Sequence, residues 1–445
     1  MNITFILIIA ITFLTPAQTN WFTVGNGANG QIFDIASDSS GIYFVGSFTQ
    51  IAGTQAKAIA KWNGIRWETF QNNFSSLSAI ALRNNEIFVG GSIQNLIGVF
   101  KWNGSNWDTI GVIPVGSIST IALDDSNLYA GGFFNSISGV SAFSAARWNG
   151  SQWHSMGNDF QAEIVSLLTI YRNQLYAGGT FIRAAKNIFN IARWQDTLWV
   201  SVNGGANLPV KSMYAYNDTL YVAGQFSQVG NFAGGSGISA QGIARWNGVN
   251  WSAIGQGLTG VPEDLIVKNN NIYVVGNFSG ANQPFQVIYK WDGVNWNLLA
   301  TANAAFTDIS FSESDNSFHI GGNFSSVSTL GTANKLVRFV DSSAIITSII
   351  NRNEIINPTE FILYQNYPNP FNPSSTISWQ SPVGSRQVMK VYDILGNEVA
   401  TLVDEYREAG RYEIEFNASH LSSGLYFYKL TMGGFSETKK MTLIK

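Results

Sequence analysis

Residues 128–153 read LYAGGFFNSISGVSAFSAARWNGSQW, and this stretch holds the two signals from which the fold can be predicted. It opens with an aromatic segment, Tyr129 to Gly132, that ends in two glycines. It closes with an Asn-Gly pair between Trp148 and Trp153. Asn and Gly tolerate positive φ, so this pair between apolar runs is typical of a tight β-hairpin. We therefore expect consecutive antiparallel strands.

Both signals recur along the chain. Paired tryptophans also occur at Trp62/Trp67, Trp102/Trp107, Trp194/Trp199, Trp246/Trp251 and Trp291/Trp296. The strand that ends in glycine occurs seven times, starting at Tyr43, Phe88, Tyr129, Tyr176, Tyr221, Tyr273 and His319. An alternating strand and a polar turn precede each of these. Each unit therefore holds four short strands at a period of about 46 residues, which is typical of propeller blades.

The number of repeats predicts how the chain closes. Seven glycine-terminated strands accompany only six complete tryptophan hairpins. The segment Leu336 to Phe339 is a first hairpin strand without a second, and Trp21 to Gly25 is a second strand without a first. Pairing them removes two open sheet edges. We expect an all-β fold: a seven-bladed β-propeller over residues 20–343, closed by its N-terminal strand.

This repeat resembles a divergent kelch-type repeat over about residues 20–343. It departs from that family by placing Trp-Asn-Gly-x-x-Trp where a Tyr-containing strand and then Trp are usual. The resemblance implies a propeller fold and carries no functional residues with it.

The N-terminal residues indicate export. Ile3 to Leu14 form one apolar run that is too short for a stable bilayer span, and small residues follow near Ala17. We expect residues 1–19 to be a secretory signal peptide; the alternative is a buried N-terminal strand. No other segment is long and apolar enough for a transmembrane span.

Composition excludes several functional classes. Charged residues are 12% of the chain and the net charge is −3, so nothing indicates a nucleic-acid partner. The absence of cysteine excludes disulfides, thiolate zinc sites and cysteine nucleophiles. Three scattered histidines make a histidine metal site a poor hypothesis. We expect no cofactor and no metal.

The composition shifts near residue 344. Five of the ten prolines lie after that point, all between Pro358 and Pro382. We expect a linker over residues 344–360. Residues 361–445 then alternate between strands and Gly/Pro turns, a pattern that fits a small Ig-like β-sandwich.

The C-terminal 85 or so residues also hold a set of motifs in a fixed order. The segment Tyr367 to Ile377 reads YPNPFNPSSTI, and further motif positions are Tyr392, Asp393, Gly396, Gly424, Tyr426, Lys440 and Lys445. This stretch resembles the type A C-terminal sorting domain of the type IX secretion system. The resemblance implies a secretion-machinery partner, Sec export, passage across the outer membrane, and a product that is secreted or held at the cell surface.

Two recurring features have a structural and a functional interpretation. The tryptophan pairs fit cross-strand packing better than a sugar-stacking platform, because every hairpin has one. A basic residue precedes each hairpin aromatic: Lys61, Lys101, Arg147, Arg193, Arg245, Lys290 and Arg338. A ring of cations for an anion is one interpretation. Cation–π and salt-bridge packing is the one we favour.

No catalytic constellation is visible in the sequence, so we expect that the chain is not an enzyme. We expect an exported surface or extracellular binding or adhesion module for a glycan or a protein. The alternatives are a carbohydrate-active propeller enzyme with scattered acids at the channel mouth, or a purely structural envelope component.

Loop lengths indicate where a ligand would lie. The first and third turns of each unit are uniformly tight, whereas length varies on the opposite face. Asn231 and Phe232 lie in the longest insertion there, and Asp159 and Phe160 lie in another loop. Variable loops on a rigid scaffold often carry recognition. We therefore expect ligand contacts at these four residues, with a neutral insertion as the alternative.

Overall fold

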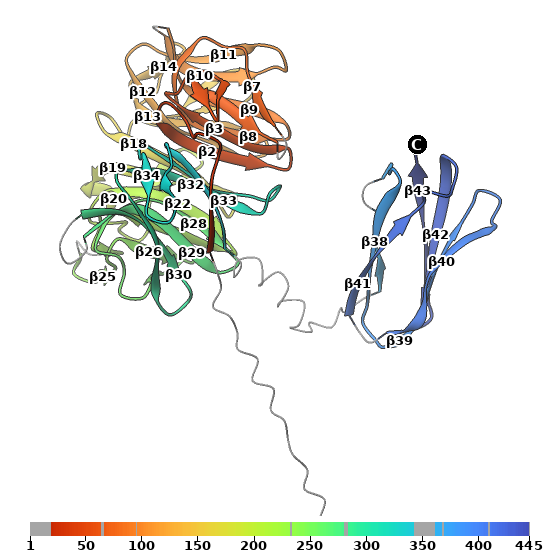
Figure 1. The fold of residues 1–445 in the computed structure, drawn as a ribbon. Coiled ribbons are helices and arrows are strands. Elements are labelled where there is room, and N and C mark those ends of the chain that lie inside the picture. Colours follow the sequence, from red (N-terminus) through yellow and green to blue (C-terminus); the bar gives the residue numbers. More distant parts are fainter. Residues whose placement is uncertain are drawn as a thin grey trace, which may run out of the picture. The chain divides into compact units, whose positions relative to one another are not determined.

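A computed structural model describes residues 19–63, 66–94, 96–231, 234–279, 284–341, 361–366, 369–407 and 410–444. The chain divides into two compact units, Met1–Ile346 and Thr347–Lys445 (Figure 1). Across the described residues the regular elements are strands, apart from one 3₁₀ turn at Ala184–Lys186. The all-β prediction is confirmed. The predicted signal peptide and linker lie outside the described residues except for Thr19.

The described residues of the first unit form seven larger antiparallel sheets. In sequence order, the first three contain β2 (Ile32–Asp38), β3 (Gly41–Gly46), β6 (Ile59–Trp62) and β7 (Trp67–Thr69); β8 (Phe74–Arg83), β9 (Glu86–Ile93), β10 (Leu96–Trp102) and β11 (Trp107–Ile113); and β12 (Gly116–Leu123), β13 (Leu128–Phe134), β16 (Ala145–Trp148) and β17 (Trp153–Ser155).

The next three sheets repeat this order of pairing. They contain β18 (Ile164–Tyr171), β19 (Gln174–Arg183), β20 (Ile188–Gln195) and β21 (Leu198–Ser201); β22 (Val210–Tyr216), β23 (Thr219–Gly224), β26 (Ile243–Trp246) and β27 (Trp251–Ala253); and β28 (Gly260–Lys268), β29 (Asn271–Ser279), β30 (Pro284–Trp291) and β31 (Trp296–Ala302), extended by β34 (Ser326–Val327) and β35 (Gly331–Thr332). Three short hairpins lie between the longer strands: β4 (Gln50–Ile51) with β5 (Thr54–Gln55), β14 (Ser136–Ile137) with β15 (Val140–Ser141), and β24 (Gln228–Val229) with β25 (Ile238–Ser239).

The seventh sheet combines the two ends of the unit. Its order is β1 (Thr19–Thr23), β36 (Leu336–Asp341), β33 (Ser317–Gly322) and β32 (Phe306–Ser312). Trp21 stands opposite Phe339, and their rings stack with centroids 4.7 Å apart. The N-terminal strand therefore covers an edge that β36 would otherwise expose.

Tryptophan pairs hold the outer hairpins and connect neighbouring sheets. The two members of each pair lie directly opposite one another, with ring centroids 5.2–5.6 Å apart. The indole N–H of Trp153, Trp199 and Trp251 donates to a carbonyl of the preceding sheet or its exit loop, at 2.6–2.9 Å. These contacts match the packing interpretation of the pairs.

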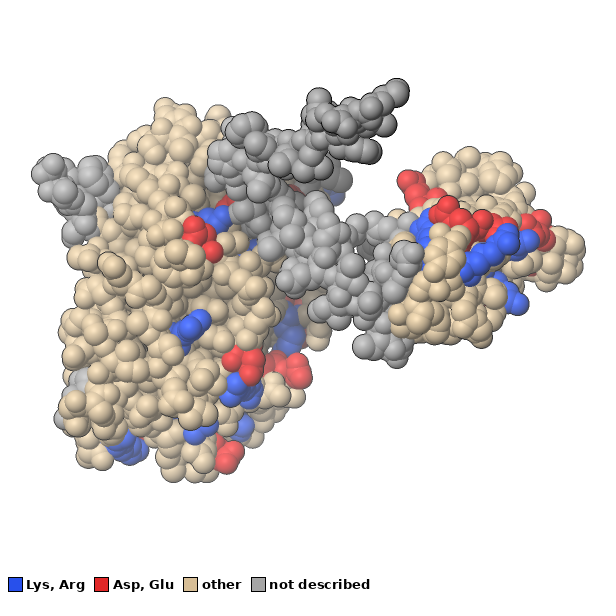
Figure 2. Space-filling view, turned by 90° about the horizontal axis from the view of Figure 1, so that it is seen from below, with Lys and Arg blue, Asp and Glu red and all other residues tan. Residues whose placement is uncertain are grey.

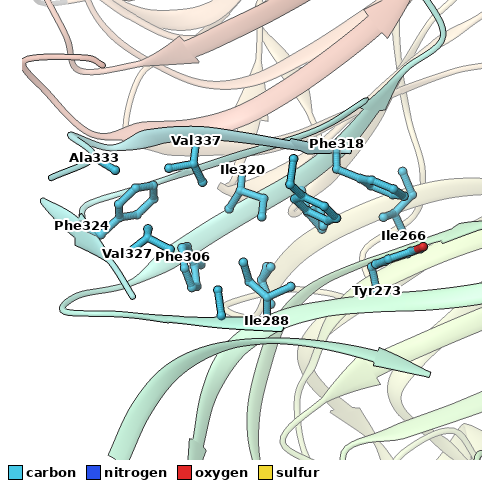
Figure 3. Close-up of a cluster of buried hydrophobic side chains, with 14 of the residues drawn as sticks. Ile266, Tyr273, Ile288, Phe306, Phe318, Ile320, Phe324, Val327, Ala333 and Val337 are labelled. Atoms are coloured by element: carbon cyan, nitrogen blue, oxygen red, sulfur yellow. The ribbon is translucent and has the colours of Figure 1, made fainter. Parts of the chain in front are cut away.

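The cores lie between adjacent sheets, and the first strands pack side by side. In the order β2, β8, β12, β18, β22, β28, β32, each contacts the next, and β32 contacts β2. Gly90 and Gly321 show why strands end in glycine: an added Cβ would lie 2.5 Å from Ile118 and 2.4 Å from Ile32 of the next sheet. Figure 3 shows one such core, with Ile320 and Val337 facing Ile288.

The second unit consists of two antiparallel sheets around one core. The first contains β37 (Ile362–Leu363), β38 (Ser374–Ser381) and β41 (Gly410–Asn417), and the second contains β40 (Glu398–Arg407), β39 (Ser385–Tyr392), β42 (Gly424–Met432) and β43 (Phe435–Leu443). Trp379, Met389 and Tyr428 are fully buried in this core. The indole of Trp379 donates to Oε1 of Gln387 at 2.7 Å, which satisfies its buried N–H.

Surface charge differs between the two units when each is viewed by itself. The face of the first unit in Figure 2 shows scattered charged side chains, whereas that of the second shows acidic and basic residues side by side. Among the described residues there is no helix with the length and apolar character to cross a bilayer.

Candidate functional site

The strongest candidate site in the described residues is a cavity of about 410 Å³ among four first strands: β22, β28, β32 and β2. Asp264 and Asp308 line it from the middle of β28 and β32. Lys268 and Glu313 line it at the ends of those strands, and aromatic side chains complete the wall. This size is within the usual range for small-molecule sites.

The two aspartates occupy a position that recurs in every sheet. Each first strand has a register shift against its neighbour, and β8 has two; the position of interest is the residue that follows this shift, or the second of the two in β8. We call it the bulge position. It is occupied by Asp34, Ala79, Thr120, Leu167, Ser212, Asp264 and Asp308.

Polar side chains at the bulge position connect one sheet to the next. The amide of Ile80 donates to Oδ2 of Asp34 at 2.8 Å, and the amide of Ile309 donates to Oδ2 of Asp264 at 2.9 Å. Hydroxyl groups do the same elsewhere, because Ser212 accepts from Leu265 at 3.2 Å and Thr120 from Leu168 at 3.3 Å. Asp308 accepts from Ile35. The bulge position therefore has a structural role in five of the seven sheets.

Three of these side chains are carboxyl groups that interact. Burial raises the pKa of Asp34 to about 6 against the effect of its amide donors, with Asp264 adding repulsion. Burial also raises the pKa of Asp264. The pKa of Asp308 rises well above its ordinary value through burial, then repulsion from Asp264 and Asp34. Asp308 and Asp264 share a hydrogen bond, so Asp308 is the group that keeps a proton.

The carboxyl cluster is incompletely satisfied. Ser212 Oγ donates to Oδ1 of Asp264 at 2.7 Å, whereas no N–H or hydroxyl group of the described residues donates to the buried Oδ2 of Asp308. No group of three or more His, Cys, Asp or Glu in the described part of the chain is placed to hold a metal ion.

The rim of the cavity already holds one cation. Lys268 forms an ion pair with Glu313, and its Nζ lies 4.1 Å from the ring centroid of Phe311. Ser37 Oγ donates to the carbonyl of Phe311 at 2.7 Å, which fixes β2 against β32. On the opposite wall, the pKa of Tyr214 is raised. Burial is the main cause, and electrostatic repulsion from Tyr216, Asp264 and Glu313 adds to it.

The four residues predicted to contact a ligand do not line this cavity. Phe160 requires a correction: its side chain is 1% exposed and packs against Phe181 and Trp199, with centroids 4.5 and 4.9 Å away. A loop aromatic has become part of a core, so its ring is not available to a ligand. Asp159 forms an ion pair with Lys186 at 2.5 Å.

The other predicted contact residues lie in the insertion between β24 and β25. The carbonyl of Asn231 accepts from the amides of Gly234 and Ser236, both at 3.1 Å. Phe232 lies outside the described residues. Lys268 and Glu313 adjoin first turns of their sheets, so the cavity extends toward the face opposite the one that loop lengths predict.

The seven basic residues lie opposite the ring at the start of the neighbouring glycine-terminated strand. Their partners, in sequence order, are Tyr43, Phe88, Tyr129, Tyr176, Tyr221, Tyr273 and His319. Several also form ion pairs: Lys61 with Glu68 at 3.3 Å, Lys101 with Glu86 at 2.6 Å, Lys290 with Asp341 at 2.7 Å and Arg338 with Asp315 at 3.6 Å. These contacts match the packing interpretation rather than an anion site.

A Ser–His–Asp group lies in the seventh sheet, but its geometry is not that of a catalytic triad. Ser317 Oγ and Asp315 Oδ2 both lie 3.1 Å from the same atom, Nε2 of His319. A triad needs the serine and the carboxylate on opposite ring nitrogens. Nδ1 of His319 is buried and has no hydrogen-bond partner among the described residues. The group instead joins the β32–β33 turn to the strand that follows it.

The C-terminal motif residues shape the second unit. Asp393 Oδ1 accepts from the amides of Leu395 and Asn397 at 2.8 and 2.9 Å, and Gly396 has φ +84°, so the turn after Tyr392 needs both. The Tyr426 hydroxyl, two residues after Gly424, donates to the carbonyl of Ser422 at 2.8 Å. The Lys440 carbonyl accepts from the side chain of Gln365 at 2.7 Å. Lys445 lies outside the described residues.

A comparison with known families identifies the family of the second unit. Residues 365–445 match the family described as the secretion system C-terminal sorting domain. The predicted resemblance is therefore confirmed. The chain carries a type IX sorting domain and is exported to the outer surface or released. No curated protein matches the sequence.

Solved structures show only distant likeness. PorZ, a bacterial surface component of the type IX secretion system of Porphyromonas gingivalis, is 14% identical, with a TM-score of 0.42 over 94% of this chain and 60% of that one. The computationally designed Ika8 protein is 11% identical, with a TM-score of 0.44 over 71% and 97% of the two chains. A protein of unknown function from Bacteroides thetaiotaomicron is 13% identical, with a TM-score of 0.39 over 73% and 76%. The chain thus spans 60% of the length of PorZ, and these scores carry no argument about function.

Proposed function

We propose that the chain is a binding or adhesion protein that type IX secretion delivers to the cell exterior. The observation that carries this proposal is the sorting domain at residues 365–445, which leaves the first unit as the part that works outside the cell. Its ligand is a glycan or a protein.

We further propose that the first unit is a kelch-like, seven-bladed β-propeller closed by its N-terminal strand. The pairing of β1 with β36 supports closure, and the contacts from β2 through β32 and back to β2 support a ring of seven blades. In this arrangement the bulge positions surround the central channel. The two sheets of the second unit fit an Ig-like sandwich.

The pair of carboxyl groups in the middle of the cavity, Asp264 and Asp308, does not have the separation that glycoside hydrolysis uses. Glycosidases use two carboxyl groups roughly 5 Å or more apart, one on each side of the scissile bond. Asp264 and Asp308 instead share a hydrogen bond, which leaves no room for a sugar carbon between them. We therefore propose a non-enzymatic role, with a carbohydrate-active enzyme as the second candidate.

A single screen tests the proposal. The mature full-length protein is exposed to a panel of glycans and extracellular-matrix proteins, and both binding and product formation are measured. Binding without turnover supports the proposal. Turnover of any glycan supports the enzyme instead, and neither binding nor turnover supports a structural envelope component.

A further inference from the structure

We propose that the cavity among β22, β28, β32 and β2 binds a primary ammonium group, such as a lysine side chain of a partner protein. This inference rests on the proposed binding function and names the chemistry that its site recognises. Four observations carry it: the distribution of the acids, the unsatisfied oxygen, the rim lysine and the size of the cavity.

The acids are concentrated on one side of the set of first strands. Asp264, Asp308 and Asp34 belong to three successive sheets in the sixth, seventh and first positions, whereas the second, third and fourth sheets have Ala79, Thr120 and Leu167. Ser212 and Thr120 show that a neutral hydroxyl makes the same contact between sheets. Structure alone therefore does not require desolvated carboxyl groups, which are costly to bury unless a counter-charge compensates them.

The cluster has hydrogen-bonding capacity left over. No N–H or hydroxyl group of the described residues donates to the buried Oδ2 of Asp308, and Asp308 lines the cavity beside Asp264, with which it shares its proton. An ammonium group offers three donors and a positive charge. It would donate to this oxygen and favour loss of the proton that Asp308 holds. A neutral sugar would satisfy acceptors but leave the charge uncompensated.

At the rim of the cavity, an ammonium group of the chain itself is already held by an acid and an aromatic ring. Lys268 Nζ is held between the carboxylate of Glu313 and the ring of Phe311. Carboxylate plus aromatic face is a favourable environment for an ammonium ion. Tyr214 and the deeper carboxyl groups offer a second environment of this kind inside the cavity. Its volume of about 410 Å³ accepts one lysine-sized side chain but not a folded segment.

The experiment compares two probes that differ in charge. Nα-acetyl-lysine amide and its uncharged counterpart, Nα-acetyl-norleucine amide, are titrated calorimetrically into the mature full-length protein at pH 7.5. We expect the lysine probe to bind and the norleucine probe to bind at least about tenfold more weakly. Equal affinity for the two probes, or no binding of the lysine probe, overturns the inference.

Isosteric variants locate the binding site. Asp264→Asn and Asp308→Asn each keep an acceptor oxygen for the neighbouring amide, and each should weaken the lysine probe about tenfold or more. Asp159→Asn, which removes an acid from the face with variable loops, is the matched control and should leave affinity unchanged. Circular dichroism establishes that each variant is folded. If either cavity variant does not fold, Tyr214→Phe and Glu313→Gln take its place, and unchanged affinity in every folded cavity variant overturns the inference.

The outcomes separate this inference from the proposed function. A chain that binds a glycan or matrix protein without turnover, but does not prefer the lysine probe, refutes the inference and keeps the function. A chain that binds the lysine probe and also hydrolyses a glycan refutes the proposed function and keeps the cavity chemistry.

Discussion

Asp34 and Ser212 stand at the same position of two sheets and make the same contact with different chemistry. Each side chain accepts a hydrogen bond from a backbone amide of the following sheet, at 2.8 Å for Asp34 and 3.2 Å for Ser212. The serine is neutral between pH 4 and pH 8, whereas the ionised aspartate lacks at this buried site the solvation that it has in water. Individual residues at one repeated position therefore determine whether the join between two sheets responds to pH.

The first prediction concerns this pH response. The pKa of Asp34 is about 6 in the folded protein and 3.8 in a model peptide. The folded state therefore binds more protons between these values, and Asp34 contributes more stability as the pH falls through 6. Asp34→Asn removes the charge and keeps one acceptor oxygen, for the amide of Ile80, while its NH2 group faces the amide of Ile35 and adds a cost that does not depend on pH. The free energy of unfolding of the variant relative to wild type should therefore rise by up to about 3 kcal/mol between pH 4 and pH 8.

Thermal unfolding of wild type and variant between pH 4 and 8 measures this difference. Comparison with wild type is necessary because buried His319 acts in the opposite direction. Burial lowers the pKa of His319, against the effect of the hydrogen bond that its imidazole donates to Asp315, so the contribution of His319 to stability falls as the pH drops below 6.5. This effect of His319 is the same in wild type and variant, so it cancels in the difference between them. A stability difference that stays constant from pH 4 to pH 8, or that falls as the pH rises, contradicts the prediction.

The second prediction concerns Phe160. Its ring is buried between Phe181 and Trp199, so Phe160→Ala should destabilise the first unit by about 3–5 kcal/mol. Asp159→Asn next to it should cost about 0–1 kcal/mol, because it removes only a surface ion pair. Urea unfolding measures both. Unchanged stability of Phe160→Ala would restore this residue as a candidate for ligand contact.

At the scale of the element, the third prediction tests the strand that joins the ends of the first unit. Trp21 of β1 stacks on Phe339, so Trp21→Ala should destabilise the unit by about 2–4 kcal/mol and promote aggregation through the loosened edge of β36. Phe22→Ala on the same strand is the control, because Phe22 is 40% exposed and should cost less. Urea unfolding and light scattering give the two readouts. An equal or larger effect of Phe22→Ala argues against the stacking of Trp21 on Phe339 as the contact that holds β1 on the edge of β36.

Elements also show what the sequence could and could not reveal. The tryptophan hairpins were predictable because Asn-Gly turns and facing aromatics are local signals. The acidic cluster was missed because Asp34 and Asp308 approach only when β2 lies beside β32. One signal was available: Asp34, Asp264 and four of the other bulge-position residues all lie nine positions before the aromatic of the next strand. The burial of Phe160 had no such signal, because a loop aromatic in a core and one in solvent have the same local sequence.

For the whole molecule, the fourth prediction separates the segment that directs export from the unit that works outside the cell. The two units have separate cores, and only residues 365–445 match the sorting family. Deletion of residues 344–445 should leave a folded first unit that accumulates in the periplasm. Cell fractionation locates the product, and protease resistance establishes that it is folded. Surface delivery of the truncated chain at normal levels would show that the export signal does not lie in residues 344–445.

The place of β36 has a mechanical consequence. Among the described residues of the first unit β36 is the last strand, ending at Asp341, and it has β1 on one side and β33 on the other. If the C-terminal end is fixed to a surface and a bound ligand pulls, tension enters along the axis of β36. The hydrogen bonds to both neighbours then share the load in shear instead of opening one at a time, as they would in a strand peeled from an edge. Pairing with β1 thus adds a second row of hydrogen bonds that must break before such a pull removes β36 from its sheet.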